Sequence, residues 1–362
     1  MSTSLTYRPR PRARTKTVKI GGLHIGGINP IAIQSMTNTD TADPKSTLAQ
    51  IKRLEKAGCQ IIRLAVPDQE AARALKQIRQ GTKLPLVADI HFDHRLALLA
   101  LEAGVDKLRI NPGNIGSKDK IKQVVKAAAQ RGVPIRIGVN AGSLEKDILA
   151  RHGRPTAQGL VESAVRHVSI LEDLGFEDIV ISLKGSEVPM TIEAYRLMSR
   201  RSKYPLHLGI TEAGTAYAGA IRSAVGIGAL LAQGIGDTVR VSLSGDPVKE
   251  VEAARIILQS LDLGSFGPVV LACPTCGRAR IDVAGIAGQV ERKIKGVKPP
   301  LKIAVMGCAV NGPGEARQAD LGIAGGSNGK GLLFKKGKVV EMVDEKMMVE
   351  RLLAEINKMS SK

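Results

Sequence analysis

The last quarter of the chain holds three of its four cysteines. Cys273 and Cys276 are separated by two residues, and Cys308 follows in a Gly/Pro-rich segment. Thiolates at a two-residue gap can bind one metal centre from a single turn, and a third thiolate from another loop can join them. No cysteine or histidine follows Cys308, so a Cys/His-only zinc site cannot be completed here. The fourth coordination position of such a centre would then be taken by an oxygen ligand such as Glu315, or would stay open.

Four interpretations of these cysteines can be weighed. A zinc ribbon needs a second Cys-x-x-Cys or a His pair, and a radical-SAM cluster needs three cysteines in one short loop; neither pattern occurs. A thioredoxin-like dithiol fits Cys273 and Cys276 between a strand and a helix, whose N-terminus would lower a thiol pKa. An iron–sulfur cluster held by three thiolates, with one iron left to Glu315 or to substrate, also uses Cys308. These last two interpretations stay open.

The composition is that of a globular enzyme with an aliphatic core. Of 362 residues, 43% are hydrophobic and only 2% are aromatic, and the length favours two domains. No run of 18 apolar residues occurs, and the basic N-terminus lacks an apolar signal region. We therefore expect no membrane span and a cytoplasmic location. In that reducing compartment, cysteines favour metal or redox chemistry over disulfides.

The net charge of +19 raises the question of nucleic-acid binding. Aromatic residues that would stack on bases are scarce, and the basic excess is spread along the chain, so we expect no nucleic-acid partner. A positive field serves a small anionic substrate equally well. The Arg/Pro-rich residues 1–16 are expected to form a flexible basic arm rather than an RNA-binding element.

A repeated strand–helix unit begins at Ala32. Each unit has a short aliphatic strand, a polar loop, an amphipathic helix and a Gly-ended turn. The predicted strands are 32–36, 61–66, 86–91, 107–111, 135–140, 179–184, 206–211 and 238–243. Together with a hairpin at 17–28, they predict an α/β fold, a (β/α)8 TIM barrel over residues 17–263. An open doubly wound sheet is disfavoured because no Gly-x-Gly-x-x-Gly follows the first strand. Residues 264–362 predict a small α+β domain that carries the three cysteines.

Polar side chains stand at the carboxyl ends of the predicted strands, where a barrel enzyme builds its active site. They are Gln34, Ser35, Arg63, Asp89, His91, Arg109, Asn111, Arg136, Asn140, Lys184, Thr211, Glu212, Arg240 and Ser242. Five are cations, and each needs neutralising if it is buried. An ion pair with Asp89 or Glu212 would satisfy any single cation, but two carboxylates cannot neutralise five. The surplus predicts a substrate with several negative charges, such as a diphosphate.

Two further side chains allow more than one interpretation. His91 can be a general acid, a phosphate donor or a core histidine, and its place beside Asp89 at a strand end favours a functional role. Cys59 stands at the start of a predicted strand, at the opposite end from the polar side chains. We expect it to be a small buried hydrophobe.

The cysteine motifs resemble those of the 4-hydroxy-3-methylbut-2-enyl diphosphate synthase family. They are Cys-Pro-Thr-Cys-Gly-Arg at 273–278 and Met-Gly-Cys-Ala-Val-Asn-Gly-Pro-Gly-Glu at 306–315. Further similar motifs lie at 34–39, 88–92, 109–114, 138–143 and 209–214, so the likeness spans almost the whole chain, in the two-domain bacterial form. The resemblance implies a 4Fe-4S cluster bound by Cys273, Cys276 and Cys308, with Glu315 as a replaceable fourth ligand.

The resemblance also implies an activity. The family reductively opens the ring of 2-C-methyl-D-erythritol 2,4-cyclodiphosphate and expels water, forming 4-hydroxy-3-methylbut-2-enyl diphosphate in the non-mevalonate isoprenoid pathway. Electrons would come from flavodoxin or ferredoxin. The family's diphosphate-binding residues correspond to Arg63, Arg109, Arg136, Lys184 and Arg240, with His91, Asn140 and Ser242 beside them. Asp89 and Glu212 are the candidates for proton handling.

The same resemblance implies a head-to-tail homodimer in which each cluster domain covers the barrel of the other subunit. The alternative function is a barrel-fused thiol–disulfide oxidoreductase that uses Cys273 and Cys276.

Overall fold

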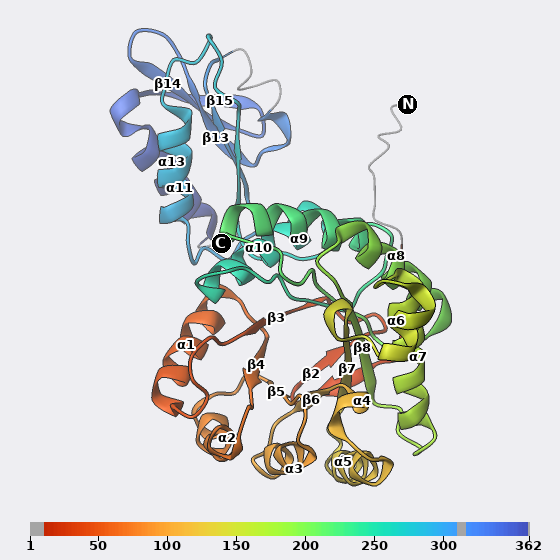
Figure 1. Ribbon diagram of the computed structural model, residues 1–362. Coiled ribbons are helices and arrows are strands. Elements are labelled where there is room, and N and C mark those ends of the chain that lie inside the picture. The colour runs from red at the N-terminus through yellow and green to blue at the C-terminus, as the bar shows by residue number, and fades with distance from the viewer. Residues whose placement is uncertain (1–10, 310–315, 361–362) are drawn as a thin grey trace. The chain divides into compact units, whose positions relative to one another are not determined.

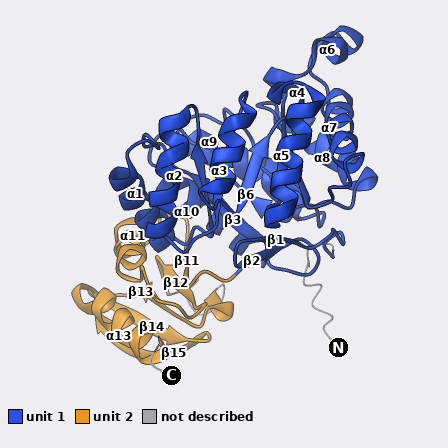
Figure 2. Cartoon of the chain, turned by 90° about the horizontal axis from the view of Figure 1, so that it is seen from below, with its two compact units in different colours: residues 1–264 blue, residues 265–362 orange. Residues whose placement is uncertain are grey.

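The structure, a computed structural model, describes residues 11–309 and 316–360 (Figure 1). The chain divides into two compact units, residues 1–264 and residues 265–362 (Figure 2). The first unit contains an eight-stranded parallel barrel and the second a five-stranded sheet with helices. The predicted fold class is therefore confirmed.

Eight parallel strands form the barrel, and they neighbour one another in sequence order around the ring. They are β3 (Ala32–Met36), β4 (Ile61–Ala65), β5 (Leu86–Asp89), β6 (Lys107–Ile110), β7 (Ile135–Asn140), β8 (Ile179–Lys184), β9 (His207–Leu208) and β10 (Thr238–Val239). Strand β10 pairs with both β3 and β9, and a parallel bridge between Ile181 and Leu206 completes the ring. Strands β5, β9 and β10 end earlier than predicted, because the following residues pass into loops at the carboxyl-terminal mouth.

Helices surround the barrel (Figure 1). They are α1 (Pro44–Ala57), α2 (Gln69–Gly81), α3 (His94–Glu102), α5 (Lys118–Arg131), α7 (Ala157–Glu172), α8 (Val188–Arg201), α9 (Ala216–Leu231) and α10 (Pro247–Ser260). Several begin at a side chain that accepts a first-turn N–H, as Asp43 does for α1 and Asp68 for α2. Short helices α4 (Pro112–Ile115) and α6 (Lys146–His152) lie in the loops after β6 and β7. None of the helices in the described ranges is long and apolar enough to cross a bilayer.

The hairpin β1 (Val18–Ile20) and β2 (Leu23–Ile25) closes one end of the ring. Its buried side chains pack against the first halves of four barrel strands, in a cluster of Val18, Ile20, Ile25, Ala32, Ile61, Val87 and Val180. These contacts show which face of each strand points inward. Because side chains alternate between the faces of a strand, residues two or four positions further along also point into the barrel.

Residues 11–16 contact the barrel, whereas residues 1–16 were predicted to form a flexible basic arm. Arg12 Nη2 donates to Asp237 Oδ1 at 2.5 Å, and Thr15 Oγ1 donates to the same oxygen at 3.0 Å. Asp237 is buried, and a buried carboxylate needs a positive or hydrogen-bonding partner. Arg12 supplies one, which fixes the segment. Residues 1–10 lie outside the described ranges.

The second unit is a mixed sheet with helices packed on it. Its strands, in sheet order, are β11 (Val269–Ala272), β12 (Lys302–Met306), β13 (Leu321–Gly325), β14 (Lys330–Lys335) and β15 (Lys338–Asp344). The first three strands are parallel and the last two pair antiparallel. Helices α11 (Val283–Lys293) and α13 (Met348–Ser360) bury apolar side chains in the same core as the sheet. Both cysteine-bearing loops follow the carboxyl ends of adjacent parallel strands, β11 and β12.

Candidate active site

Charged side chains fill the upper part of the barrel. Arg63 and Asp89 lie two residues beyond the inward-facing Ile61 and Val87, and Asp89 pairs in register with Arg109. Arg63 Nη2 donates to Asp89 Oδ2 at 2.6 Å, and Arg109 Nη1 lies 3.3 Å from Asp89 Oδ1. Burial would raise the pKa of Asp89, but Arg63, the hydrogen bond with His91 and Arg109 together hold it well below its ordinary value. Asp89 is therefore an ionised carboxylate that binds two arginines.

His91 stands at the mouth of the barrel beside this cluster. Its Nε2 lies 3.2 Å from Asp89 Oδ2 and 3.1 Å from Arg109 Nη1. Its side chain is 47% exposed, so the interpretation as a core histidine is wrong. Arg109 also donates to the carbonyl of Gly138 at 3.1 Å, and a Cβ at that glycine would lie 2.4 Å from Arg109 Nε. Glycine at 138 therefore leaves room for the guanidinium.

Three more buried cations have no carboxylate partner within the described ranges. Arg136 donates from Nη1 to Ser182 Oγ at 2.8 Å, while its Nε and Nη2 are buried without a partner. Lys107, which pairs in register with the inward-facing Val87, is 0% exposed and its Nζ has no hydrogen-bond partner. Burial and the nearby arginines lower the pKa of Lys107, of Arg136 and of Lys184 well below their ordinary values.

Arg240 has a carboxylate partner that the sequence reasoning missed. Glu250 of α10 is 4% exposed, and its Oε1 lies 3.3 Å from Arg240 Nη2. The second carboxylate of this charged cluster is thus Glu250, whereas Glu212 is exposed. A signal was present in the sequence, since Glu250 falls on the apolar stripe of α10 with Pro247, Val251 and Ala254.

The barrel interior therefore carries a surplus of positive charge. Within the described residues the cations of this cluster are Arg63, Lys107, Arg109, Arg136, Lys184 and Arg240, and its carboxylates are Asp89 and Glu250. A further buried carboxylate, Asp237, pairs with Arg12 and is not counted here. Six cations against two carboxylates leave four positive charges to be balanced when all are ionised. Like charges in a low-dielectric interior repel strongly, so this arrangement suits a bound anion with several charges.

A pocket of about 490 Å³ opens among the loops after β7, β8 and β9. Asn140 and Glu212 line it together with Ser143, Arg154, Glu187 and Thr211. Glu212 has a φ of +54°, a left-handed conformation that is unusual for glutamate and is found often at functional sites. Ser242 lies half-buried in the loop after β10. The predicted barrel residues thus stand at one end of the ring. Arg154 lies in the loop after α6, not at the end of a strand, so the search for polar residues at strand ends did not include it.

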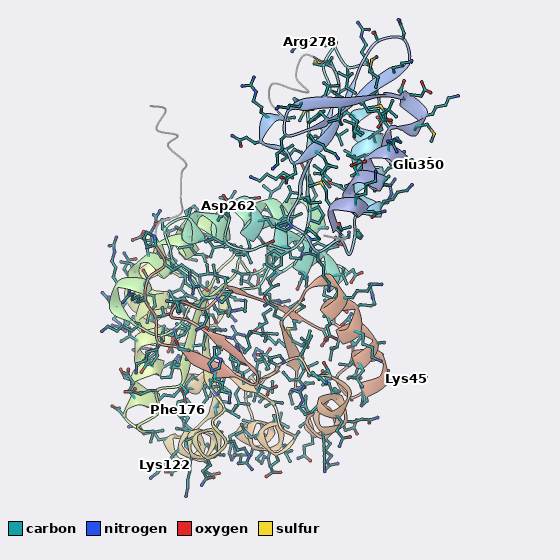
Figure 3. All side chains as sticks on the ribbon, turned by 180° about the vertical axis from the view of Figure 1, so that it is seen from behind. Lys45, Lys122, Phe176, Asp262, Arg278 and Glu350 are labelled. Atoms are coloured by element: carbon teal, nitrogen blue, oxygen red, sulfur yellow. The ribbon has the colours of Figure 1, made fainter. Side chains whose placement is uncertain are left out.

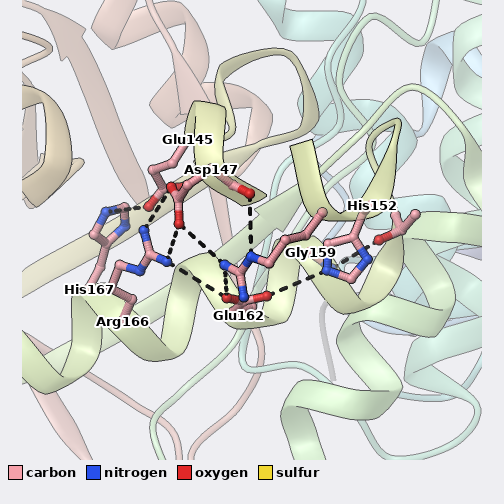
Figure 4. Close-up of polar contacts among 9 residues, drawn as sticks. Glu145, Asp147, His152, Gly159, Glu162, Arg166 and His167 are labelled. Carbon is pink, nitrogen blue, oxygen red and sulfur yellow. Dashed lines mark hydrogen bonds and ion pairs between the residues drawn. The ribbon is translucent and has the colours of Figure 1, made fainter. Parts of the chain in front are cut away.

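The loop after β7 is anchored by a charged network between α6 and α7 (Figure 4). His167 Nε2 lies 3.0 Å from Glu145 Oε1, and Arg166 Nη2 donates to Asp147 Oδ2 at 2.7 Å. Glu162 accepts from Arg151 and lies 3.4 Å from His152 Nε2. These contacts fix α6, and with it the segment that carries Asn140 and Ser143.

The three cysteines lie in two adjacent loops of the second unit, Cys273 and Cys276 after β11 and Cys308 after β12. Cys273 Sγ accepts a hydrogen bond from the backbone N–H of Gly307, next to Cys308, at 3.0 Å. Cys276 is exposed, and hydrogen bonds from the backbone and side chain of Arg278 lower its thiol pKa. Figure 3 labels Arg278 in the second unit. None of the cysteines forms a disulfide. Glu315, the predicted fourth ligand, lies outside the described residues.

This arrangement bears on the two open interpretations of the cysteines. No group of three His, Cys, Asp or Glu side chains in the described ranges converges on a single metal ion. A four-iron cluster binds each thiolate through a different iron, so its ligands need not converge in that way. The dithiol hypothesis relied on a helix N-terminus, but α11 begins only at Val283, after a turn. Cys59, by contrast, is buried, and burial raises its pKa to about 12, as suits an inert hydrophobe.

Comparison with known proteins places the chain in a family. Residues 15–255 match the GcpE TIM-barrel domain, and residues 269–358 match the GcpE protein C-terminal domain. A protein of Caldanaerobacter subterraneus subsp. tengcongensis is 60% identical over 96% of this chain and 98% of its own length. One of Brevibacillus brevis is 58% identical over 96% of each. Both are named 4-hydroxy-3-methylbut-2-en-1-yl diphosphate synthase (flavodoxin).

Among solved structures, the crystal structure of dihydropteroate synthase from Stenotrophomonas maltophilia is similar to the barrel. Its TM-score is 0.50 at 17% identity, and the match covers 68% of this chain and 98% of that one. At this identity the likeness shows the barrel fold alone. The two matched domains and the relatives show that this chain belongs to the GcpE family.

Proposed function

We propose that this chain is an oxidoreductase that converts 2-C-methyl-D-erythritol 2,4-cyclodiphosphate to 4-hydroxy-3-methylbut-2-enyl diphosphate, a step of the non-mevalonate isoprenoid pathway. The names of its relatives support the activity. The observation that carries the proposal is the surplus of buried cations in the barrel, which suits a substrate with a diphosphate group. The thiol–disulfide alternative receives no support from these relatives.

The five cations Arg63, Arg109, Arg136, Lys184 and Arg240 bind the diphosphate, with Asn140 and Ser242 at the mouth. Arg136 offers two buried donors that have no other partner within the described residues, and Arg63, Arg109 and Arg240 each keep an unpartnered Nε. A hydrogen bond to a charged group contributes roughly 1.5–3 kcal/mol. Four or five such bonds can thus account for micromolar binding, which corresponds to about 8 kcal/mol.

Proton handling falls to residues near the mouth. The leaving hydroxyl departs as water, so it must receive a proton. Asp89 is a poor donor, since its pKa is held well below the ordinary value while it pairs with Arg63 and Arg109. It positions these arginines and His91 instead. His91 and Glu212 are exposed enough to exchange protons with solvent, and we assign the proton to one of them.

Cys273, Cys276 and Cys308 hold a 4Fe-4S cluster, with Glu315 as the fourth ligand. Three observations support this cluster. The two cysteine loops follow neighbouring parallel strands, the thiols form no disulfide, and the pKa of Cys276 is lowered. When bound, the cluster supplies single electrons and a Lewis-acidic iron with one exchangeable position. Flavodoxin, which the relatives' names contain, or ferredoxin delivers the electrons.

The active unit is a head-to-tail homodimer, in which the cluster unit of one subunit serves the barrel of the other. An exposed apolar stripe on α9 supports an association surface. Tyr217, Ile221 and Val225 are 81%, 49% and 56% exposed and lie at four-residue spacing, which places them on one helix face.

An anaerobic assay with reduced flavodoxin tests the activity. The cluster-loaded protein is expected to form the linear diphosphate from the cyclic one. Lys184→Met removes one buried cation, so we expect the KM to rise by about tenfold or more, as for the loss of one charged hydrogen bond. The exposed Lys122→Met on α5 should leave KM unchanged. A wild-type protein that forms no product would refute the proposal.

Iron analysis separates the proposal from the dithiol alternative. We expect about four irons per chain in anaerobically purified protein, and loss of iron in Cys308→Ala. The dithiol alternative predicts a colourless protein in which Cys308→Ala is fully active.

A further inference from the structure

We propose that Glu250 is a positioning residue for anion binding, because it orients Arg240 and the loop after β10 toward the phosphate oxygens. This inference rests on the proposed diphosphate site and adds a residue to it. Neither the strand-end pattern nor the family motifs found in the sequence include Glu250.

The carboxylate of Glu250 joins three separate parts of the barrel. Its Oε2 accepts from Ser35 Oγ of β3 at 2.9 Å. Its Oε1 accepts from Arg240 Nη2 at 3.3 Å and from the backbone N–H of Leu243 at 3.1 Å. Leu243 directly follows Ser242, so one carboxylate fixes a cation of the site and the backbone beside a second site residue.

Because Glu250 is buried, its carboxylate depends on these three contacts. Glu250 is almost fully buried on the first turn of α10, where an unpaired carboxylate would be costly. Ser35, Arg240 and Leu243 all donate to it, which suits an ionised carboxylate. Burial lowers the pKa of Arg240, and the charge of Glu250 opposes that shift, which keeps the guanidinium charged.

Arg240 retains donors for a ligand while Glu250 holds it. Only Nη2 contacts Glu250, and Nε is buried without a partner within the described residues. Planar guanidinium groups bind phosphate through two nitrogens at fixed geometry, so their orientation decides whether both bonds form. A guanidinium clamped at one nitrogen presents the others in a defined direction.

The loop itself is tied to the segment that follows β3. Asn38 Nδ2 donates to the carbonyl of Gly245 at 3.3 Å, and Arg53 of α1 pairs with Asp246. Ser35 and Asn38 belong to the motif at residues 34–39, for which the diphosphate site by itself gives no role. Glu250 gives Ser35 a role, since the hydroxyl fixes the second carboxylate oxygen.

The sign of the Glu250→Gln effect separates positioning from simple electrostatics. Glutamine keeps the shape of the side chain but removes one negative charge from a site that binds anions. If only the field mattered, pyrophosphate would bind more tightly to this variant. If Glu250 orients Arg240, pyrophosphate binds more weakly, by about tenfold for the loss of one well-oriented charged hydrogen bond.

A double-mutant cycle on the cluster-loaded full-length protein tests this. Pyrophosphate is the probe, and its Kd is measured by calorimetry for wild type, Glu250→Gln, Arg240→Ala and the double variant. Glu102→Gln, on the exposed side of α3, is the control with the same charge change. Ser35→Ala is a second probe of the same contacts, in case Glu250→Gln does not fold.

We expect Glu250→Gln to weaken binding, Ser35→Ala to do so to a smaller extent, and Glu102→Gln to have no effect. In the Arg240→Ala background, Glu250→Gln should weaken binding no further. Unchanged or tighter binding in Glu250→Gln and Ser35→Ala, or equal weakening with and without Arg240, overturns the inference. Because pyrophosphate is not turned over, these results are independent of the activity assay. A wild type that binds no pyrophosphate contradicts the inference and the anion site together.

Discussion

At the scale of single residues, the barrel is defined by cations that lack carboxylate partners. A protein interior rarely tolerates such groups without compensation. Asp89 is shared by Arg63 and Arg109, and Glu250 serves Arg240. Arg136, Lys184 and Lys107 have no such partner within the described residues, so a bound diphosphate would relieve their mutual repulsion.

Lys107 gives a prediction about stability and pH. Replacing Lys107 with Met removes a fully buried amine, so we expect the free energy of unfolding at pH 7 to rise by about 1–3 kcal/mol. The folded pKa of Lys107 is lowered, so the unfolded chain binds more protons between that value and the unfolded pKa of about 10.4. The wild type is therefore stabilised as pH rises through this window, and its difference from Lys107→Met should shrink.

Urea denaturation at several pH values measures this difference for Lys107→Met. The control is Lys122→Met, an exposed lysine on α5 in the same strand–helix unit. Each variant is compared with wild type by its difference in unfolding free energy. If this difference depends on pH equally for Lys107→Met and Lys122→Met, the lowered pKa of Lys107 is contradicted.

The residues that the sequence reasoning missed share a physical cause. Arg63, Arg109 and Arg136 were identified because polar side chains were sought toward the carboxyl ends of the predicted strands. Lys107 was missed because it is the first residue of its strand. It nevertheless lies on the same inward-facing side of β6 as Arg109. Glu250 lies on a helix, and only the packing of that helix against β3 shows that its carboxylate reaches Ser35.

At the scale of elements, the hairpin β1–β2 forms an apolar floor under the charged interior. Its buried Val18, Ile20 and Ile25 pack on the starts of the barrel strands. The sequence predicted the hairpin and the eight strands from turn glycines and short aliphatic segments. It could not show that Arg12 contacts the barrel. That contact is with Asp237, which lies 225 residues further along the chain.

A substitution in the hairpin tests the role of this floor. Ile20 is completely buried, so Ile20→Ala should lower the free energy of unfolding of the barrel by about 2–5 kcal/mol. The neighbouring Lys19 is exposed on the opposite face of β1, and Lys19→Ala should change it by less than about 0.5 kcal/mol. Denaturant unfolding gives both values. Similar small effects for the two variants would mean that the hairpin does not support the barrel.

At the scale of the whole molecule, the proposed head-to-tail dimer makes each active site from two chains. A Cys308→Ala chain lacks a cluster ligand, and an Arg109→Ala chain lacks a diphosphate ligand. In a mixed dimer, one site would combine the intact barrel of the first with the intact cluster unit of the second. Random mixing should restore roughly a quarter of the wild-type activity. Each variant alone is the control, and a mixture that stays inactive would exclude the shared site.

The central claim is that electrons delivered to this protein open the cyclic diphosphate. The direct measurement is an anaerobic titration with reduced flavodoxin that records electrons consumed and linear diphosphate formed in the same sample. The account predicts two electrons consumed for each molecule of product, and no product with Cys308→Ala. Product formed without electron consumption, or electrons consumed without product, would contradict it.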